Sequence, residues 1–331
     1  MKILVVSGFL GSGKTTFIRK MIEKTGKPLV VLENEYGDTS LDAAEIRQAG
    51  DDSLNVMEFM EGCVCCTQKD SFANSLIAIS ASLDPEYLVV EPSGVGRLSN
   101  IMRIAGSVTW EKIRLLRPVV ILSPLAFQAQ LSEYGSIYED QVRNAGHIVF
   151  SHMDHVPGDM VPALTETIRK LNPEAEITTS PYGQLDAAWF NRLFMEAGDL
   201  HVDEMAEPGA DLQLDQYTLK NVCLRTPADL IMLMENLLHG ALGNIPRAKG
   251  TVACGDEWFR FDLASGQYAV TGSQDGEHVP QCVFIGTDIR REAILSYFEV
   301  PEETLRNEWF RFGMDGRSRK KTAEGDGTGK R

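Results

Sequence analysis

The sequence predicts an α/β fold with a mostly parallel sheet and helices on both faces, followed by a smaller α+β domain. Residues 1–197 alternate short apolar runs with helical stretches, a pattern that is typical of a parallel sheet covered by helices. Beyond residue 216, predicted strands outnumber helices and are joined by short turns, which favours an antiparallel sheet with helices on one face.

A glycine-rich loop follows the first predicted strand, Lys2–Ser7. Residues Gly8–Thr15 fit G-x-x-x-x-G-K-[ST] and lead into a predicted helix over 15–24, which makes this a P-loop NTPase domain. Its glycines let main-chain N–H groups point inward at a triphosphate, beside the positive end of the helix. Lys14 is expected to neutralise the β- and γ-phosphates, and the Thr15 hydroxyl to bind Mg²⁺. The predicted nucleotide-binding residues of this segment are Gly8, Gly11, Ser12, Gly13, Lys14, Thr15 and Thr16.

A later predicted strand, 88–91, ends in an acid. P-loop hydrolases carry a carboxylate at this point to hold Mg²⁺ through water, so Glu91 is expected to serve with Lys14 and Thr15 as the catalytic group. Pro92-Ser93-Gly94 follows, and the Gly94 amide is available to the γ-phosphate. Many strands end in an acid, so this interpretation depends on the P-loop before it.

Three thiols lie within four positions of the segment Glu61–Cys66. A disulfide between the adjacent Cys65 and Cys66 would be strained, whereas thiolates at Cys63, Cys65 and Cys66 suit Zn²⁺ or another soft divalent ion. Three ligands leave a tetrahedral site open, so the sequence predicts an exchangeable site completed from elsewhere. The alternative is that the thiols are small buried apolar groups in a turn.

These motifs together resemble those of the CobW-like metallochaperone GTPases, which are relatives of the nickel-insertion GTPases of urease and hydrogenase maturation. The resemblance covers residues 1 to about 180 and depends on Gly8–Thr15, Glu33–Asp38, Gly62–Cys66 and Glu91–Gly94. It implies GTP hydrolysis coupled to delivery of Zn²⁺, Co²⁺ or a similar ion to a client protein. The implied ligands of the transition metal are Cys65 and Cys66, with Cys63 and Glu33 as partners and Asp38 as a second acidic candidate.

The base-recognition segment departs from this family. Ser151-His152-Met153-Asp154 stands where most GTPases carry N-K-x-D. Asp154 can accept hydrogen bonds from the guanine N1 and N2 donors, which adenine lacks. His152 can stack on a purine. We therefore expect a reduced preference for guanine, with His152 and Asp154 as base-binding residues.

The predicted organisation is a P-loop GTPase domain over 1–197, an acidic linker over 198–215, a CobW-type α+β domain over 216–315 and a disordered basic tail over 316–331. Single strands are expected over 115–122 and 217–224, and a closing helix over 185–197. The single histidines, including His147, are expected to lie at the surface or in packing. In the second domain, Arg247 and Lys249 fit a solvated turn better than a contact with a client or with the first domain.

Composition limits the partners. The 331 residues carry a net charge of −15, which disfavours binding to a nucleic-acid backbone and suits partners that are proteins or cations. No apolar run reaches the roughly 18 residues of a membrane span, and Met1-Lys2 runs directly into a strand, so we expect neither a membrane segment nor a signal peptide and place the chain in the cytoplasm.

The sequence therefore predicts a protein that uses GTP, Mg²⁺ and a divalent transition metal, with a client metalloprotein or cofactor-assembly protein as its partner. Intrinsic hydrolysis is expected to be slow, because the sequence identifies no arginine finger. Two other functions are left open. One is a nucleotide-dependent enzyme whose thiols only pack, and the other is a redox switch in which thiol oxidation alters nucleotide turnover.

Overall fold

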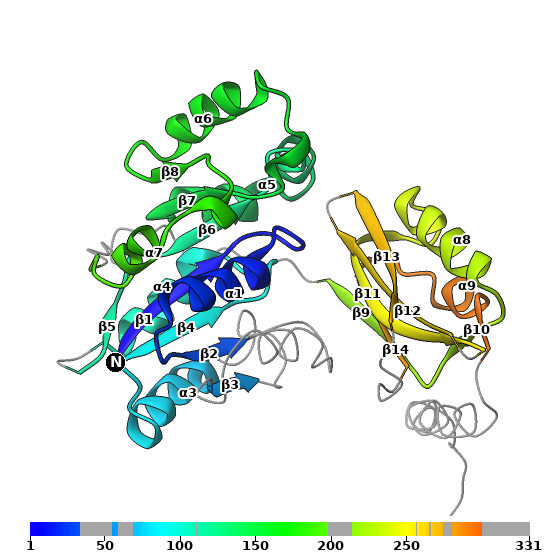
Figure 1. Ribbon diagram of the computed structural model, residues 1–331, viewed down its shortest axis with the longest axis horizontal. Helices are drawn as coiled ribbons and strands as arrows, with labels where there is room; N and C mark the ends of the chain where they lie inside the picture. Colours follow the sequence, from blue (N-terminus) through cyan, green and yellow to red (C-terminus); the bar gives the residue numbers. More distant parts are fainter. Residues whose placement is uncertain are drawn as a thin grey trace, which may run out of the picture.

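Two sheets form the framework of the chain (Figure 1). The computed structural model describes residues 1–33, 55–58, 69–109, 112–197, 214–255, 257–264, 266–273 and 280–299. The first sheet is parallel and the second is almost entirely antiparallel, which confirms the predicted fold class. Within this described part, none of the helices has the length and apolar character that crossing a bilayer requires.

The first sheet has the strand order β3-β2-β4-β1-β6-β7-β8, and β5 also pairs with β1. Each of its pairings is parallel, so the carboxyl ends of its strands meet at one edge. In an open parallel sheet this edge is where ligands bind. The strands are β1 (Lys2–Ser7), β2 (Val30–Glu33), β3 (Asn55–Glu58), β4 (Tyr87–Glu91), β5 (Arg114–Leu115), β6 (Val119–Leu122), β7 (His147–Phe150) and β8 (Glu176–Thr178).

Helices cover both faces of this sheet because its central strands alternate between two cores. In β1, Ile3 and Val5 join one apolar cluster, whereas Leu4 and Val6 join the other. The first cluster includes side chains of α3, α4, α5 and α6, and the second those of α1 and α7. The helices are α1 (Lys14–Thr25), α3 (Lys69–Ser82), α4 (Leu98–Ser107), α5 (Phe127–Arg143), α6 (Met160–Leu171) and α7 (Ala187–Leu193).

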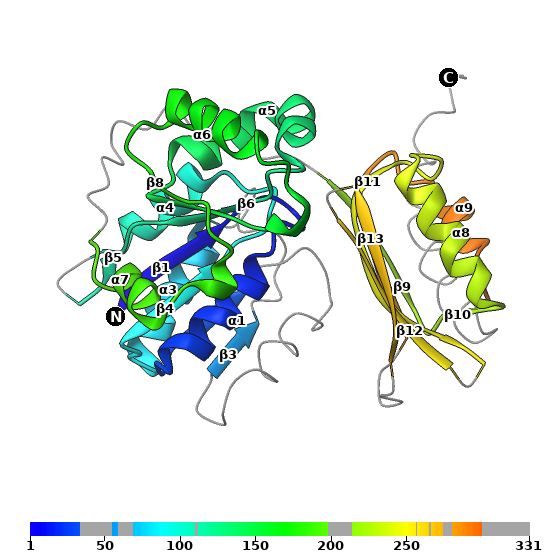
Figure 2. The same cartoon turned by 45° about the horizontal axis from the view of Figure 1, so that its top comes forward.

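The second sheet carries its helices on one face. Figures 1 and 2 both show α8 (Pro227–Leu238) and α9 (Arg291–Leu295) on the side turned away from the first domain. The start of α8 is fixed by a capping box between Thr226 and Asp229, with Pro227 in the first turn. The strands are β9 (Asp215–Lys220), β10 (Cys223–Leu224), β11 (Asn244–Cys254), β12 (Glu257–Ala264), β13 (Gln267–Ser273), β14 (Gln281–Thr287) and β15 (Phe298–Glu299).

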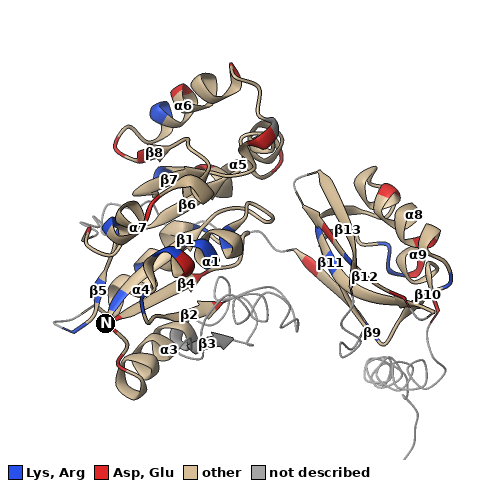
Figure 3. Ribbon diagram, viewed as in Figure 1, with Lys and Arg blue, Asp and Glu red and all other residues tan. Residues whose placement is uncertain are grey.

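The other face of the second sheet contacts the first domain. Val283 and Ile285 of β14 are fully buried and belong to the same apolar cluster as the first-domain core. At the start of β11, Asn244 donates a hydrogen bond to Glu133 of α5. Over the described residues, Lys and Arg occur in both domains (Figure 3).

Three expected elements differ from the observed ones for local reasons. The single strand expected over 115–122 is divided into β5 and β6 at Pro118, which has no N–H for a ladder bond. The strand expected over 217–224 breaks at Asn221, where φ is 56°. The closing helix starts later than the expected 185–197, because Asp186 caps it by accepting a hydrogen bond from Trp189 N at 2.8 Å, and it ends at Leu193.

His147 in β7 is a packing residue, which is one of the two places that the sequence allowed for it. Its ring is only 1% exposed, and its Nε2 lies 2.9 Å from Glu196 Oε2. Glu176 also faces the ring, while Arg192 pairs with both carboxylates and Arg117 with Glu196. Burial lowers the pKa of His147 from its usual 6.5, although Glu196 and Glu176 oppose the shift.

This histidine predicts a pH dependence of stability. The unfolded chain takes up a proton at His147 near pH 6.5 and the folded chain only at lower pH, so its contribution to stability is complete above pH 6.5 and is lost as the pH falls below it. The loss is at most about 1.4 kcal/mol per pH unit. Urea unfolding at pH 7.5 and 5.5 is expected to show a larger drop for wild type than for His147→Gln. Equal drops would contradict the lowered pKa.

Candidate functional site

The loop between β1 and α1 has the backbone shape that its glycines allow. Gly8, Gly11 and Gly13 have φ of 143°, 69° and 93°, values that are unfavourable for other residues. A Cβ at Gly8 would lie 2.3 Å from the Ile121 carbonyl oxygen, so this position also has no room for a side chain. The loop is closed by a hydrogen bond from Ser12 N to Phe9 O of 3.1 Å. The loop therefore places glycine backbone next to the N-terminal end of α1, which is the arrangement that an anion-binding site requires.

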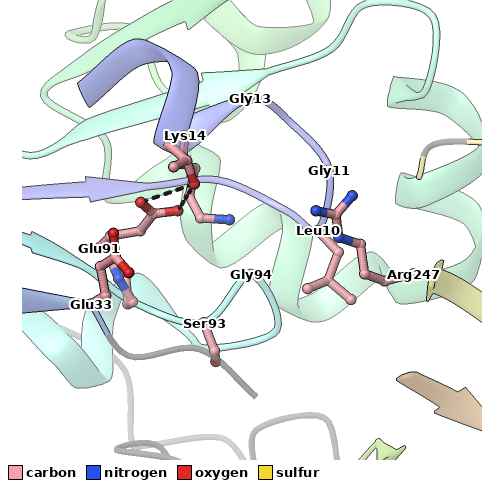
Figure 4. Close-up of a pocket in the computed structure, with 11 residues that line it drawn as sticks. Leu10, Gly11, Gly13, Lys14, Glu33, Glu91, Ser93, Gly94 and Arg247 are labelled. Atoms are coloured by element: carbon pink, nitrogen blue, oxygen red, sulfur yellow. Dashed lines mark hydrogen bonds between the residues drawn. The ribbon is translucent and has the colours of Figure 1, made fainter. Parts of the chain in front are cut away.

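Lys14 and Thr15 follow this loop at the start of α1. Lys14 is 8% exposed, and its Nζ donates to Phe9 O at 3.4 Å. Thr15 Oγ1 donates to Glu91 Oε1 at 2.9 Å and lies 3.2 Å from Oε2 (Figure 4). Hydroxyl and carboxylate oxygens are ligands that Mg²⁺ prefers, so this donor set fits the ion. The Mg²⁺ role of Thr15 and Glu91 stays a prediction.

Glu33 lies in the same pocket. β2 and β4 pair in parallel with Glu33 opposite Glu91, and both residues line the pocket with Lys14 and Thr15 (Figure 4). Glu33 is 8% exposed, which is unusual for an acid. The structure thus brings the candidate transition-metal ligand Glu33 beside the candidate Mg²⁺ residue Glu91.

The turn after β4 packs directly on the phosphate loop. A Cβ at Gly94 would lie 2.5 Å from Leu10 N and 2.8 Å from Phe9 C, so only glycine fits without moving backbone. The Gly94 carbonyl accepts a hydrogen bond of 3.2 Å from the buried Gln141 Nε2. Gly94 lines the pocket, and its backbone is tied to both α5 and the loop.

The predicted base-binding loop lies next to the phosphate loop. His152 has φ of 51°, and its Nε2 would be 3.9 Å from a Cβ at Gly13. Its side chain is exposed to solvent, yet desolvation by the protein around it lowers the pKa of His152, while Asp154 and then Asp262 oppose the shift. The neutral ring of His152 is therefore favoured near neutral pH. A neutral ring is sufficient for the predicted stacking on a base. Asp154 is exposed at the start of the short helix Met153–His155.

Tyr182 is a site residue that the sequence analysis missed. Its hydroxyl would be 3.2 Å from a Cβ at Gly13, and its ring packs edge-on against Phe17 of α1. Burial raises the pKa of Tyr182, while Arg19 and a hydrogen bond with Thr16 lower it. The available signal was an aromatic residue in a Pro-Tyr-Gly turn that follows β8 at the carboxyl edge of the sheet.

Arg247 is a further residue at this site. The sequence analysis favoured a solvated turn for Arg247 and Lys249 over a contact with the first domain, and that expectation is wrong. Both lie within β11; the Arg247 side chain is 12% exposed and Lys249 is 3% exposed. Arg247 lines the same pocket as Glu33 and Glu91 from the other domain, and it forms an ion pair with Asp262 of β12. A neighbouring pocket is lined by Thr16 and His152 of the first domain together with Arg247 and Asp262.

The remaining predicted metal ligands lie outside the described residues: Cys63, Cys65, Cys66 and Asp38. In the part of the chain that is described, Cys223, Cys254 and Cys282 are free thiols, which agrees with cysteines that do not form disulfides there. Among the described histidines, cysteines and acids, His147, Glu176 and Glu196 are close enough to hold an ion. Arg192 and Arg117 already neutralise these carboxylates, so this group acts as an ion-pair network.

Comparison with known proteins identifies two families of domains. Residues 2–179 match the model described as "CobW/HypB/UreG, nucleotide-binding domain", and residues 222–300 match "Cobalamin synthesis protein cobW C-terminal domain". The "Zinc chaperone YjiA" of Escherichia coli (strain K12) is 26% identical over 315 residues, covering 89% of this chain and 97% of that protein.

Two further likenesses are more limited. The "Zinc-regulated GTPase metalloprotein activator 1" of Schizosaccharomyces pombe is 27% identical over 192 residues, which is 56% of this chain and 46% of that protein. The crystal structure of Zn(II)-bound YjiA GTPase from E. coli aligns with a TM-score of 0.44 at 18% identity, covering 90% of this chain and 97% of that one.

The contact between Gly94 and the phosphate loop predicts that one methyl group added at Gly94 weakens nucleotide binding. In Gly94→Ala the new Cβ meets backbone atoms of Leu10 and Phe9, so the loop must shift. We expect nucleotide binding to weaken by about 1–3 kcal/mol, the usual cost of overpacking. Titration with a fluorescent guanine nucleotide measures this. Gly158→Ala is the matched control, because nothing lies within 4 Å of its Cβ position. If both variants bind like wild type, the loop does not depend on this contact.

Proposed function

The chain belongs to the CobW/HypB/UreG family, and from this we propose that it is a GTP-hydrolysing metallochaperone. Its nucleotide state controls the binding of a divalent transition metal, of the zinc or cobalt type, and the delivery of that metal to a client metalloprotein or cofactor-assembly protein. The matches to a nucleotide-binding domain and to a CobW C-terminal domain support the proposal. Relatives that are named zinc chaperones support the choice of metal.

One observation carries the proposal: Glu33 and Glu91 stand opposite each other on neighbouring parallel strands of the nucleotide pocket. Neighbouring strands lie about 4.8 Å apart, so two carboxylates in register repel each other unless a cation is close. Lys14 lines the same pocket, and a divalent ion adds a stronger counter-charge. A change in the charge near Glu91 therefore alters the environment of Glu33.

The nucleotide half of the proposal assigns a role to each part of the pocket. The backbone of Gly8–Thr15 holds the phosphates, Lys14 neutralises the β- and γ-phosphates, and Thr15 and Glu91 hold Mg²⁺. When bound, the ion would neutralise charge on the phosphates. Gly94 offers its amide to the terminal phosphate.

In the proposed function, the transferred metal ion is bound by Cys65 and Cys66, with Cys63, Glu33 and Asp38 as further ligands. Thiolates select a soft or borderline ion, and an acid makes the site easier to empty than an all-thiolate site. Because Glu33 lies next to Glu91, the triphosphate and the cargo ion act on a shared carboxylate environment. Linkage then requires that GTP and metal change each other's affinity by the same factor.

The central test is metal affinity in two nucleotide states. Wild type is expected to bind Zn²⁺ with affinities that differ by about 5- to 150-fold between a non-hydrolysable GTP analogue and GDP, which corresponds to a coupling of about 1–3 kcal/mol. Competition with a chromophoric chelator measures both affinities.

The Cys65→Ser/Cys66→Ser double variant is expected to lose tight metal binding and the dependence on nucleotide. Cys223→Ser, which alters a thiol of β10, is the matched control and is expected to behave as wild type. Equal metal affinity in both nucleotide states of wild type would overturn the proposal. Loss of binding in the control as well would remove the assignment of the ion to Cys65 and Cys66.

Base selectivity gives an independent test. Asp154→Ala removes the acceptor for the guanine N1 and N2 donors, and hydrogen bonds to a charged group contribute about 1.5–3 kcal/mol. GTP affinity is expected to fall about 10-fold or more, with ATP affinity unchanged, in competition binding. Asp159→Ala changes an exposed carboxylate outside both pockets and serves as the control. A fall in ATP affinity equal to that in GTP affinity would contradict guanine recognition by Asp154.

A further inference from the structure

Arg247 reaches the nucleotide pocket from the opposite domain. It shares that pocket with Gly11, Lys14, Thr15 and Glu91, and Figure 4 shows its guanidinium directed at the loop beside Gly11 and Leu10. Its strand belongs to the second sheet, and more than 200 residues of sequence lie between it and the phosphate loop. A cation delivered from another domain to a phosphate loop is the arrangement of an arginine finger.

The strand positions Arg247 through its alternation. Ala248 is fully buried in the core beneath α8, so Arg247 points to the opposite face, which is the face toward the first domain. The pairing of β11 with β14 is irregular between Asn244 and Arg247, and such an irregularity bends a strand and redirects a side chain. Just before it, Asn244 is bound to Glu133 of α5. This end of β11 is therefore fixed against the first domain.

Asp262 holds the guanidinium in place. It lies on β12 opposite Lys249, so Arg247 reaches it diagonally across the two strands. The Asp262 side chain is 43% exposed, and it also acts on the charge of His152 in the base-binding loop. A partner of this kind orients an arginine while water still screens the pair, so a more highly charged phosphate competes effectively for the guanidinium.

We propose that Arg247 is a catalytic residue of GTP hydrolysis that the C-terminal domain supplies to the terminal phosphate. This assigns an arginine where the sequence identifies none, and it deepens the proposed function, since it assumes that GTP is the substrate. Hydrolysis then depends on the placement of the second sheet against the first domain.

The chemistry requires only charge stabilisation from Arg247. The oxygen of a water molecule forms a bond to the γ-phosphorus, and the bond from that phosphorus to the β–γ bridging oxygen breaks, leaving its electron pair on GDP. One water proton stays on the new phosphate, and the other passes to a phosphate oxygen or to solvent. Arg247 stays protonated throughout and donates hydrogen bonds to the γ-phosphate oxygens as their charge shifts toward the bridging oxygen.

Single-turnover hydrolysis with saturating GTP and Mg²⁺ tests this assignment. Arg247→Ala is expected to slow hydrolysis by at least about 100-fold, the cost of losing one group that stabilises transition-state charge. Affinity for GDP is expected to stay within about twofold of wild type, because GDP lacks the phosphate that Arg247 contacts, whereas affinity for GDP with fluoroaluminate falls with the rate. Arg247→Lys is expected to be intermediate, since lysine keeps the charge without the planar fork.

Three comparisons separate catalysis from a structural effect. Added guanidinium ion is expected to restore part of the rate of Arg247→Ala, which repair of a folding defect does not do. Asp262→Ala breaks the ion pair while keeping the guanidinium, so its hydrolysis falls far less. Arg225→Ala is the control for the loss of a positive charge. Arg225 is exposed, pairs with Asp229 and Ser296 O in the same domain, and lines neither pocket.

The outcomes are distinct. An unchanged rate in Arg247→Ala, or an equal loss of GTP and GDP affinity, overturns the assignment. So does a rate in Asp262→Ala as low as in Arg247→Ala, because the ion pair would then be the cause. A wild type that hydrolyses GTP through Arg247 without any link between metal and nucleotide contradicts the proposed function and leaves this assignment standing.

Discussion

Glu33 and Glu91 stand side by side because β2 and β4 pair in parallel register from Val30 opposite Leu88 to Glu33 opposite Glu91. β4 in turn pairs in register with β1, which delivers the chain into the phosphate loop. These pairings bring three carboxyl ends of strands to one edge of the sheet. A shift of register by one residue would reverse every side chain of a strand and separate the two acids from Thr15. The site therefore depends on a backbone constraint more than on any one side-chain contact.

Packing on both faces of the sheet fixes this register. The alternation of Ile3 and Val5 with Leu4 and Val6 ties β1 to two cores, so β1 cannot slide without exposing apolar groups on both sides. The loop and the turn at Gly94 then fit together because neither has a side chain at the contact. The part of the pocket in the first domain is built from local sequence and sheet geometry, while Arg247 is added from a separate domain.

The sequence predicts well the features that depend on residues close together in the chain. The loop Gly8–Thr15, the strands around it and the fold class follow from motif and periodicity, and the structure confirms the fold. Strand breaks at Pro118 and Asn221 were missed, because an apolar run hides the loss of one N–H or one left-handed residue. Tyr182 was missed, and Arg247 was assigned to a solvated turn, for a different reason. Their proximity to the phosphate loop arises from tertiary packing, and for Tyr182 the sequence offered only the weak signal of an aromatic turn at the carboxyl edge of the sheet.

The two domains contribute different parts of the site. The first domain holds both candidate acids, the phosphate loop and the candidate base-binding loop, whereas the second presents Arg247 and Asp262 across the pocket. Buried Val283 and Ile285 join the second sheet to the first core, so the two domains are in contact at an apolar surface as well as at Asn244 and Glu133.

The most direct measurement of the central claim is GTP-analogue affinity with and without saturating Zn²⁺, in wild type and in Glu33→Gln. The substitution keeps the shape of the side chain and removes the charge beside Glu91. We expect Zn²⁺ to change nucleotide affinity in wild type. In Glu33→Gln this change is expected to largely disappear while the affinity without metal is kept. An effect of Zn²⁺ that is equally large in Glu33→Gln would show that the two acids do not link the metal to the nucleotide.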